Sequence, residues 1–286
     1  MHQIYISSLV TSIAAVLLIG GFIKGRSKKE DRNILFFLFL LELPMAFIAY
    51  YLVRMPLVDG LFKILLGSNE NIYGFVKIFY APITEEPAKL FPLLFPFFRK
   101  RINKNNFVMA AMALGLGFGV GEIWLVGSFI TQSAQFAEMP WYYFSGFMNE
   151  RFMVCIIHAG MTTLALRKLG NKFISGILAA MLMHFTGNFP IYLSRINFPG
   201  FGNDAWQVIL QIWVGLFFIT AILILVRSSF GNFSFAQFFI GSSTCPKCGS
   251  VYPPPLLALN WFTKRYEKCP NCKKWHWVTI WSKESN

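Results

Sequence analysis

The chain has 286 residues, of which 55% are apolar and only 14% are charged. A soluble globular domain carries roughly 25% charged residues, so this composition excludes an ordinary soluble domain and indicates lipid as the solvent. The net charge of +13 invites a nucleic-acid partner. However, most lysines and arginines stand in short clusters between apolar runs, as in the cytoplasmic loops of membrane proteins. The charge pattern therefore disfavours nucleic-acid binding.

Seven segments are apolar and long enough to cross a membrane, for which about 20 residues are needed. They are residues 4–23, 34–53, 72–98, 107–130, 147–166, 173–193 and 206–226. The first lacks a basic n-region and a small-residue cleavage site, so we interpret it as a retained span. The third contains four prolines and is predicted to be kinked. The sequence thus predicts an all-α, polytopic membrane helix bundle of about seven transmembrane helices over residues 1–229.

The distribution of basic residues between the spans predicts the orientation. Clusters follow the first, third and fifth spans: Lys24, Arg26, Lys28, Lys29 and Arg32; Arg99, Lys100, Arg101 and Lys104; Arg167, Lys168 and Lys172. The intervening loops are predicted to hold Arg54 and Lys63, then no basic residue, then Arg195. Because basic loops face the cytoplasm, the N-terminus is predicted to be outside and the C-terminus in the cytoplasm. We expect an integral protein, with a prokaryotic cell membrane as its location.

Ionisable residues inside a span are costly, so each one needs a reason. Those that stand out lie in the second span (Glu42), the third (Glu85, Glu86 and Lys89), the fourth (Glu122), the fifth (Arg151 and His158) and the sixth (His184, with Asn188 one turn later). At about 1.5 Å of rise per residue, Glu85, His158 and His184 lie about halfway along their spans, and Glu122 lies somewhat past the middle of its span, toward the outside. Four helices are therefore expected to place acid or imidazole groups at similar depth.

Helical spacing adds a second argument. His184 and Asn188 are four residues apart and share a helix face, and Glu85 and Lys89 have the same spacing and can pair. The fourth span carries small residues at alternate positions, which let a neighbouring backbone approach closely. These glycines, at positions 115, 117, 119 and 121, are expected to serve packing and to bring Glu122 against another helix.

Taken singly, several of these residues have an ordinary structural interpretation. Glu42 is interpreted as a structural hydrogen-bonding group, Arg151 as an anchor at the membrane interface, and Lys89 as a charge that neutralises a neighbouring glutamate. The combined set favours a catalytic centre instead. Its members are Glu85, Glu86, Glu122, His158, His184 and Asn188.

Two kinds of chemistry use such a set. A carboxylate can take a proton from water while a His/Asn pair polarises a carbonyl group and holds the oxyanion, which describes peptide-bond hydrolysis. Alternatively, histidines and glutamates can bind a catalytic metal with a water in an open position. Two histidines flanking a glutamate on one helix, the pattern of soluble metalloproteases, do not occur in this sequence. A catalytic metal would therefore need ligands from separate helices.

The order of the motifs resembles a known family. Glu85-Glu86-x-x-Lys89, Phe118-x-x-x-Glu122, His158 and His184-x-x-x-Asn188 follow one another on successive spans. This arrangement resembles the PrsW-like intramembrane proteases, which share a superfamily with the CAAX prenyl proteases and bacteriocin-processing membrane proteins. The resemblance covers roughly residues 72–193.

The resemblance implies specific roles. Glu85 would activate a water with Glu86 beside it, and His184 and Asn188 would stabilise the oxyanion. The CAAX branch ends the fourth-span motif in histidine, whereas Glu122 stands here, as is usual for the PrsW-like branch. His158 is then the candidate for the second group on the water. The superfamily has been described both as metalloproteases and as glutamate-type enzymes, and we favour the glutamate type.

The C-terminal segment has a different character. Cys245-Pro246-Lys247-Cys248 and Cys269-Pro270-Asn271-Cys272 form two C-x-x-C motifs about twenty residues apart, which is typical of a tetrahedral metal site. The segment resembles a zinc ribbon over residues 245–286, joined by an interfacial linker at 230–244. Four thiolates leave no open position, so we predict a structural zinc, with iron as the alternative. Disulfides are disfavoured in the reducing cytoplasm.

The partners follow from these assignments. The predicted function is an intramembrane endopeptidase that hydrolyses a peptide bond of a membrane-anchored protein. A transporter or proton relay would also cluster ionisable groups at mid-membrane, and a non-catalytic scaffold with a working ribbon is a third alternative. Basic and aromatic ribbon residues favour a protein or anionic-lipid partner beside the bilayer. These residues are Lys264, Arg265, Lys268, Lys273, Lys274, Trp261, Trp275 and Trp277.

Overall fold

The computed structural model describes residues 2–66, 70–170, 172–230, 243–252, 258–261 and 264–279. The chain forms two compact units, Met1–Leu225 and Val226–Asn286. The first is helical, and the second contains the strands. Residues 231–242, which make up most of the interfacial linker predicted at 230–244, lie outside the described residues.

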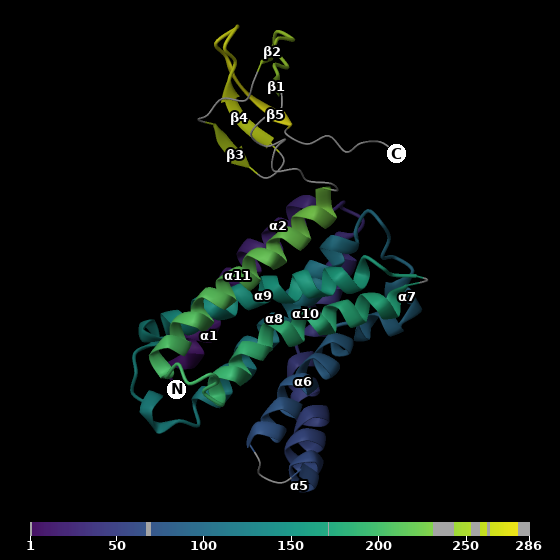
Figure 1. Ribbon diagram of the computed structural model, residues 1–286. Coiled ribbons are helices and arrows are strands. Elements are labelled where there is room, and N and C mark those ends of the chain that lie inside the picture. The colour runs from purple at the N-terminus through teal and green to yellow at the C-terminus, as the bar shows by residue number, and fades with distance from the viewer. Residues whose placement is uncertain are drawn as a thin grey trace. The chain divides into compact units, whose positions relative to one another are not determined.

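The helical unit begins with α1 (Ile4–Ala15), η1 (Val16–Gly20), α2 (Gly21–Arg26), α3 (Arg32–Glu42), α4 (Met45–Ile48), η2 (Ala49–Phe62), α5 (Lys63–Leu66) and α6 (Glu70–Ala88). It continues with η3 (Phe91–Leu94), α7 (Pro96–Arg99), α8 (Phe107–Ile130), η4 (Ala134–Phe136), η5 (Trp141–Phe144), α9 (Ser145–Leu166), α10 (Phe173–Arg195) and α11 (Asn203–Phe230). Figure 1 shows these helices in chain order from purple to green.

Five continuous helical stretches in the described part of the chain are long and apolar enough to cross a membrane. They are Ile4–Arg26, Arg32–Leu65, Phe107–Ile130, Phe173–Arg195 and Asn203–Ser229. The predicted third and fifth spans are helical as α6 and α9 over much of their length, but their polar residues keep them outside this group. A bundle of membrane-spanning helices is thus supported, while the count of seven stays a prediction.

The side chains on the outside of the bundle agree with a lipid environment. Leu17, Leu52, Ile64 and Ile174 are between 69% and 80% exposed. In the most apolar 18-residue stretch of Asn203–Ser229, only 11% is buried. Soluble monomers rarely expose contiguous apolar surface of this extent, so these faces are suited to contact acyl chains.

The second helical stretch differs from the prediction. The sequence predicts that this span ends at Val53 and that a loop holds Arg54 and Lys63. The helix instead continues to Leu65, and η2 is a π-helix of 14 residues that contains Pro56. Proline has no backbone N–H and disturbs regular α-helical bonding, which is consistent with the irregular helix here. The loop positions predicted for Arg54 and Lys63 are therefore wrong.

The third predicted span breaks at its prolines, as expected. Pro82 and Pro87 lie inside α6, which ends at Ala88, and Pro96 opens the short helix α7, a position that proline favours. α6 packs back against η2. Figure 1 shows this helical hairpin extending beyond the neighbouring helices towards α5.

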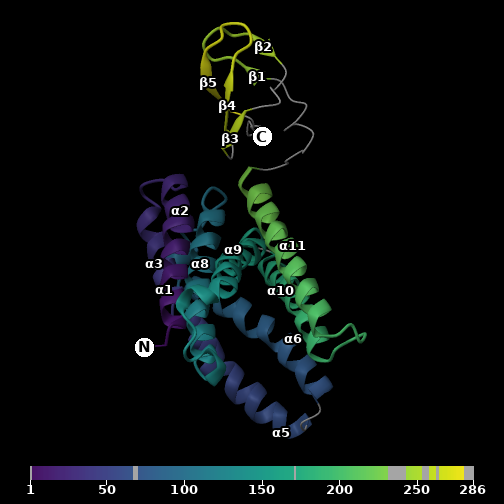
Figure 2. The same ribbon diagram turned by 90° about the vertical axis from the view of Figure 1, so that its left-hand side faces the viewer.

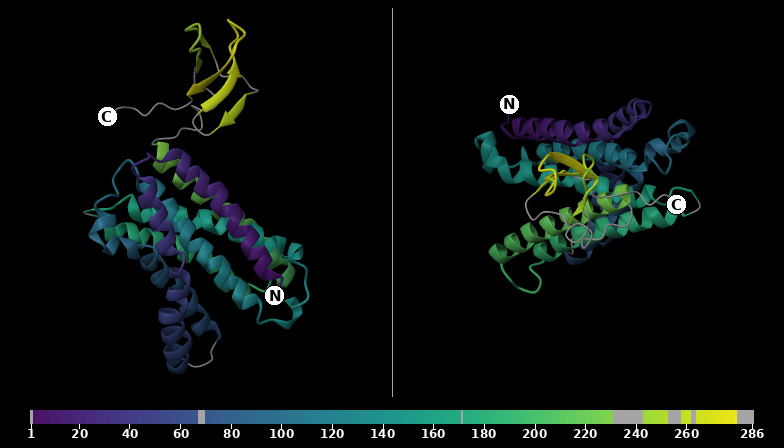
Figure 3. Two further views of the ribbon diagram at one scale, coloured as in Figure 1. Left: turned by 180° about the vertical axis from the view of Figure 1, so that it is seen from behind. Right: turned by 90° about the horizontal axis from the view of Figure 1, so that it is seen from above.

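α8 is the packing centre of the unit, and it contacts α9, α3 and α1. Its glycines face two neighbours in turn. A Cβ added at Gly115 would overlap the Ala159 backbone of α9, and one at Gly117 would overlap the Phe39 carbonyl of α3. The predicted close backbone approach is confirmed. Figure 3 shows from behind how the purple N-terminal helix runs alongside this group.

The C-terminal unit contains two small antiparallel sheets. β1 (Ser243–Thr244) pairs with β2 (Val251–Tyr252), and β4 (Lys264–Lys268) pairs on one side with β3 (Leu259–Trp261) and on the other with β5 (Trp275–Thr279). Each C-x-x-C motif lies in the connection of one antiparallel pair, β1–β2 or β4–β5. Figure 2 shows both strand pairs.

Candidate active site and metal centre

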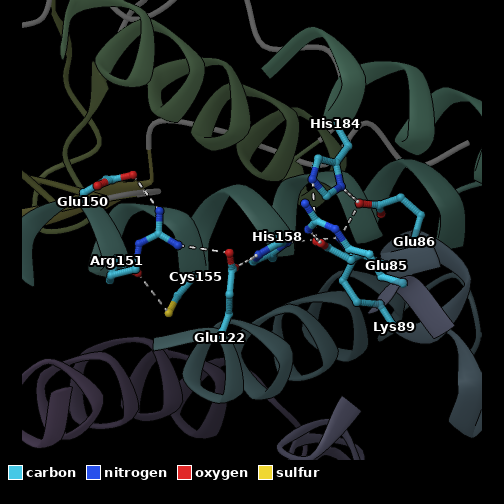
Figure 4. A network of polar contacts seen from close by, with 10 residues as sticks. Glu85, Glu86, Lys89, Glu122, Glu150, Arg151, Cys155, His158 and His184 are labelled. Atoms are coloured by element: carbon cyan, nitrogen blue, oxygen red, sulfur yellow. Dashed lines mark hydrogen bonds and ion pairs between the residues drawn. The ribbon is translucent and has the colours of Figure 1, made fainter. Parts of the chain in front are cut away.

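Polar side chains from α6, α8, α9 and α10 form one connected network inside the helical unit (Figure 4). Its buried part contains Glu86, Lys89, His158 and His184, all less than 10% exposed. The packing of α8 against α9 and of α10 against α6 and α9 brings these groups together. Acid and imidazole groups that are far apart in the sequence thus meet at one place, as the shared depth predicted.

One half of the network joins α6 to α10. His184 lies with Nδ1 2.6 Å from Glu86 Oε1 and with Nε2 3.6 Å from Glu85 Oε2. An ionised carboxylate only accepts hydrogen bonds, so Nδ1–H donates to Glu86. In the neutral imidazole, Nε2 is then a free acceptor that faces Glu85. The Glu85–His184 pair therefore has a place for one additional proton.

The other half joins Lys89, the residue directly after α6, to α9 and α8. Lys89 Nζ lies 2.6 Å from Glu86 Oε1 and 3.1 Å from His158 Nδ1. Because an ammonium group only donates, His158 Nδ1 accepts, and His158 Nε2–H donates to Glu122 Oε2 at 2.6 Å. Lys89 thus fixes the tautomer of His158 and, through it, orients Glu122.

Beyond Glu122 the network continues towards the surface. Arg151 Nη1 lies 3.0 Å from Glu122 Oε1, and Arg151 Nη2 lies 2.6 Å from Glu150 Oε1. The Arg151 side chain is 13% exposed, whereas that of Glu150 is 46% exposed. The sequence favours an interfacial anchor at Arg151. The structure instead shows it paired with Glu122, so its charge belongs to the network.

A small cavity lies between Glu85 and Glu122, the two side chains at the ends of the buried part of the network. It has a volume of about 70 Å³ and is lined by Glu85 of α6, Glu122 of α8, Tyr50 and Arg54 of η2, and apolar side chains. About 10–15 Å³ suffices for one water molecule when polar partners are present. The cavity thus has room for a few water molecules between two carboxylates that come from different helices.

A second, larger hollow lies along the same helical hairpin. It measures about 950 Å³ and is lined mainly by apolar residues of α4, η2 and α6, with others from η3 and α10. Thr84, Pro87 and Ala88 belong to its wall, so the turn of α6 that carries Glu85 and Glu86 borders both spaces. An extended or helical apolar segment can therefore approach this turn.

The predicted site residues can now be placed. Five of the six lie in the network: Glu85, Glu86, Glu122, His158 and His184. Asn188 is half-buried one turn beyond His184, and none of the hydrogen bonds among the described residues joins it to the network. Lys89 pairs with Glu86 and not with Glu85, to which the four-residue spacing assigns it. Glu42 is fully buried, and neither of its carboxylate oxygens has a hydrogen-bond partner among the described residues.

Besides Arg151, the sequence pattern misses the roles of Arg54 and Lys89 in this site. It assigns Arg54 to a loop, because the apolar run stops at Val53. It gives Lys89 only a neutralising role, although Lys89 contacts both Glu86 and His158. A signal for Arg54 exists in its position, since an arginine directly after an apolar run can still lie within a longer helix.

The network also bears on a catalytic metal. The described residues contain one group of three or more histidine, cysteine or carboxylate side chains whose ligand atoms lie within 4.8 Å of one another, the four cysteines of the C-terminal unit. In the network, the positive charge between Glu86 and His158 is the ammonium group of Lys89. The donor set is thus arranged around a lysine.

The four cysteines of the C-terminal unit converge. Cys245 Sγ lies 3.7 Å from Cys272 Sγ, and Cys248 Sγ lies 3.7 Å from Cys269 Sγ. A tetrahedral ion with sulfur ligands at about 2.3 Å requires sulfur atoms about 3.8 Å apart, whereas a disulfide requires about 2.05 Å. The sulfurs therefore fit a single metal ion, and disulfide bonds are absent among them.

Neighbouring groups prepare the thiols for this role. The Cys272 backbone N–H donates to Cys269 Sγ at 3.4 Å, and Gly249 takes a left-handed conformation (φ +72°) after the first motif, as expected for a tight turn. Hydrogen bonding from Ser250 lowers the pKa of the Cys248 thiol to about 6. Cys248 is thus readily present as the thiolate, which is the form that binds metal.

The basic and aromatic residues of the C-terminal unit divide into two groups. Arg265 is buried, where its guanidinium pairs with Glu267 and Ser243, so it is not accessible to an external partner. Trp275 and Trp277 are about half exposed and pack around Tyr266. An exposed aromatic surface is thus present on β4 and β5.

Comparison with known proteins gives no assignment: no family model, no curated protein and no solved structure matches this chain.

Proposed function

We propose that this chain is an intramembrane endopeptidase of the glutamate type, as its resemblance to the PrsW-like proteases implies. The observation that carries the proposal is the cavity shared by Glu85 and Glu122, with a histidine paired to each carboxylate. Two largely buried carboxylates on one small water-sized space are costly to maintain. Water activation supplies a reason for them.

The chemistry is a hydrolysis in two steps. The Glu85 carboxylate takes a proton from a water in the cavity as the water oxygen bonds to the carbonyl carbon of the substrate peptide. The carbonyl electrons move onto its oxygen to form an oxyanion. When they return, the C–N bond breaks and the proton held at Glu85 or His184 Nε2 passes to the leaving nitrogen. One carboxylic acid and one amine result.

Glu122 is proposed as the second group on the water, in the place where the sequence suggests His158. Glu122 lines the cavity, whereas His158 lies behind it and donates to its Oε2. Lys89 and Arg151 hold this His158–Glu122 unit from either side. The role of His158 is therefore to position Glu122. The hollow of about 950 Å³ beside α6 is proposed to receive the membrane-anchored protein substrate.

The glutamate type is favoured over a metalloprotease by two observations. Lys89 already supplies a cation between Glu86 and His158. The histidine nitrogens point at carboxylates or at Lys89, and they do not converge on a common point. A lysine ammonium in this position would oppose the binding of a second cation by charge repulsion.

A proton relay is the second candidate, because the chain from Glu85 through His184, Glu86, Lys89 and His158 to Glu122 is continuous. Hydrolysis is favoured because both ends of this chain line the same cavity. Moreover, the side chain that follows Glu122 in the network is Arg151, and arginine does not release its proton in proteins. Proton uptake by vesicles that carry the native protein, and none with Glu85→Gln, would favour the relay.

We further propose that the protein is an integral protein of a prokaryotic cell membrane with its N-terminus outside. The alternation of basic loops supports this orientation, and the helical placement of Arg54 and Lys63 removes two basic residues from an outside loop. The four-cysteine module is then cytoplasmic and holds one structural zinc. Its partner is a protein or an anionic lipid surface, in which the exposed Trp275 and Trp277 would take part.

The experiment that tests the proposed function works with an unidentified substrate. Cells lacking the native gene are supplied with either the native protein or Glu85→Gln, and the N-termini of their membrane proteins are compared by mass spectrometry. With Glu85→Gln, at least one membrane-anchored protein should accumulate uncleaved and lose its internal new N-terminus. Identical sets of N-termini at equal protein levels would contradict the proposal.

A further inference from the structure

Arg54 is the cationic side chain of the cavity wall. It comes from η2, outside the part of the chain that carries the family resemblance, and it stands two residues before Pro56 in the π-helix. π-helical segments occur frequently at functional sites. Here the segment directs Arg54 to the same cavity that Glu85 and Glu122 line.

The contacts of Arg54 leave much of its hydrogen-bonding capacity unused. Its Nη1 lies 3.9 Å from Glu85 Oε1, which is an ion pair but too long for a hydrogen bond. Its guanidinium lies over the Tyr50 ring, 5.6 Å from the centroid. Its Nε is buried and has no hydrogen-bond partner in the described part of the chain.

An arginine with unmatched donors is expensive in this position. A buried donor without a partner costs free energy, and more so when the group is charged. A small shift of Arg54 towards Glu85 would satisfy one N–H, yet the side chain stays at ion-pair distance with Tyr50 under its plane. An oxygen atom of a ligand that enters the cavity would accept hydrogen bonds from these Arg54 N–H groups.

Arg54 is the charged donor of the cavity wall, and the other donor there is the neutral hydroxyl of Tyr50. Glu85 and Glu122 are acceptors when ionised. His184 directs its two ring nitrogens at Glu86 and Glu85, and Asn188 is not part of the cavity wall. The reaction creates a negative charge on the carbonyl oxygen, and preorganised donors at that oxygen are a large contribution to catalysis.

We infer that Arg54 binds the carbonyl oxygen of the scissile peptide and stabilises the oxyanion that forms when water attacks; this inference rests on the proposed function. The planar guanidinium donates two N–H groups to that oxygen. As the water oxygen bonds to the carbonyl carbon, Glu85 takes the water proton and the new negative charge appears beside Arg54. Arg54 is thus a catalytic residue in addition to those that the sequence motifs indicate.

The test compares four variants of the full-length protein, purified in detergent and reconstituted into vesicles: Arg54→Met, Arg54→Lys, Glu85→Gln and Arg195→Met. Arg195 is an exposed arginine at the end of α10 and serves as the matched control. The probe is the membrane fraction of cells that lack the gene. The measured quantity is the rate at which new internal N-termini appear, at several pH values.

The expected result is a rate for Arg54→Met that is about 10²- to 10³-fold below that of the native protein at every pH, the usual loss for one oxyanion donor. Arg54→Lys should recover part of the rate, because it keeps the charge without the planar fork. Arg195→Met should equal the native protein. Thermal unfolding of each variant shows whether it is folded; if Arg54→Met is not, Arg54→Lys decides, and a native rate there overturns the inference.

Two other outcomes overturn it as well. If Arg54→Met cleaves at the native rate while Glu85→Gln is inactive, Arg54 has no catalytic role. If the Arg54→Met rate returns at higher pH, Arg54 only keeps Glu85 ionised and does not contact the oxyanion. The failure of the proposed function is separate and recognisable, because Glu85→Gln would then produce new N-termini as fast as the native protein.

Discussion

At the scale of single residues, the buried Lys89 is the cation that neutralises the buried carboxylate of Glu86. It is fully buried, lies 2.6 Å from Glu86 Oε1 and contacts His158. Removing one partner of a buried pair leaves an uncompensated charge, which costs about 3–5 kcal/mol. An exposed pair such as Lys28 and Glu30, 3.7 Å apart, contributes far less.

We therefore predict that Lys89→Met and Glu86→Gln each lower the free energy of unfolding by about 3–5 kcal/mol. The double variant should lose less than the sum, because neither charge is then left alone. Unfolding by SDS titration in mixed micelles measures this, with Lys28→Met as a control that changes little. Additive losses would show that the two side chains are not coupled.

The residue types of the site are predictable from the sequence, but their pairing is not. Midpoint depth and helical spacing identify Glu85, Glu86, Glu122, His158 and His184. Spacing alone assigns Lys89 to Glu85, whereas the fold places it on Glu86 and His158. The pairing depends on the contacts between α6, α9 and α10, and these depend on packing that no local pattern encodes.

At the scale of elements, the glycines of α8 set how closely α8 packs against α9, and the site lies across that interface. Gly115 touches the backbone of α9 at Ala159, so a side chain there would push the helices apart. Glu122 of α8 and His158 of α9 are hydrogen-bonded at 2.6 Å across the same interface. The geometry of the site therefore depends on a contact between backbones.

Gly115→Ala should consequently be destabilising, by about the 1–3 kcal/mol typical of overpacking, and should lower cleavage because it separates Glu122 from His158. Gly215→Ala in α11 is the matched control, since an added Cβ there meets nothing within 4 Å. Thermal unfolding and cleavage rates of both variants test this. If Gly115→Ala behaves like Gly215→Ala, close packing of α8 on α9 is not required.

The elements themselves are only partly predictable. Apolar runs locate the helices, and the prolines of the third span locate its break after Ala88. The predicted end of the second span is wrong, because it assumes that Arg54 leaves the apolar region. The helix continues past Arg54, which forms an ion pair with Glu85 of α6, and a hydropathy pattern does not contain such a tertiary partner.

At the scale of the whole molecule, the chain combines a unit with helices long and apolar enough to cross a membrane and a unit whose four cysteines could hold a metal ion. The C-x-x-C spacing predicts the second unit because ligands close together in sequence form most of the site. The helical unit requires contacts between residues as distant as Glu86 and His184. Local spacing therefore specifies the metal centre far better than the candidate active site.

For the metal centre we predict about one zinc per chain by elemental analysis of the purified full-length protein. Cys269→Ser combined with Cys272→Ser should remove it, because two of the four thiolates are lost. Cys155→Ser should retain it, since Cys155 is buried in α9 and belongs to the helical unit. A full zinc load in the double variant would place the metal elsewhere.

The proposed function depends above all on Glu85 as the group that activates the water. Its most direct test is the cleavage rate of the purified protein on the membrane protein that accumulates in cells with Glu85→Gln. The comparison is between Glu85→Gln and Glu42→Gln, both of which neutralise a carboxylate in a helix of the same unit. We predict that Glu85→Gln lowers the rate at least 10²- to 10⁴-fold, the usual contribution of a general base. Glu42→Gln should cleave at nearly the native rate, because Glu42 is buried away from the cavity wall. A folded Glu85→Gln protein that cleaves as fast as Glu42→Gln would contradict a role for Glu85 in water activation.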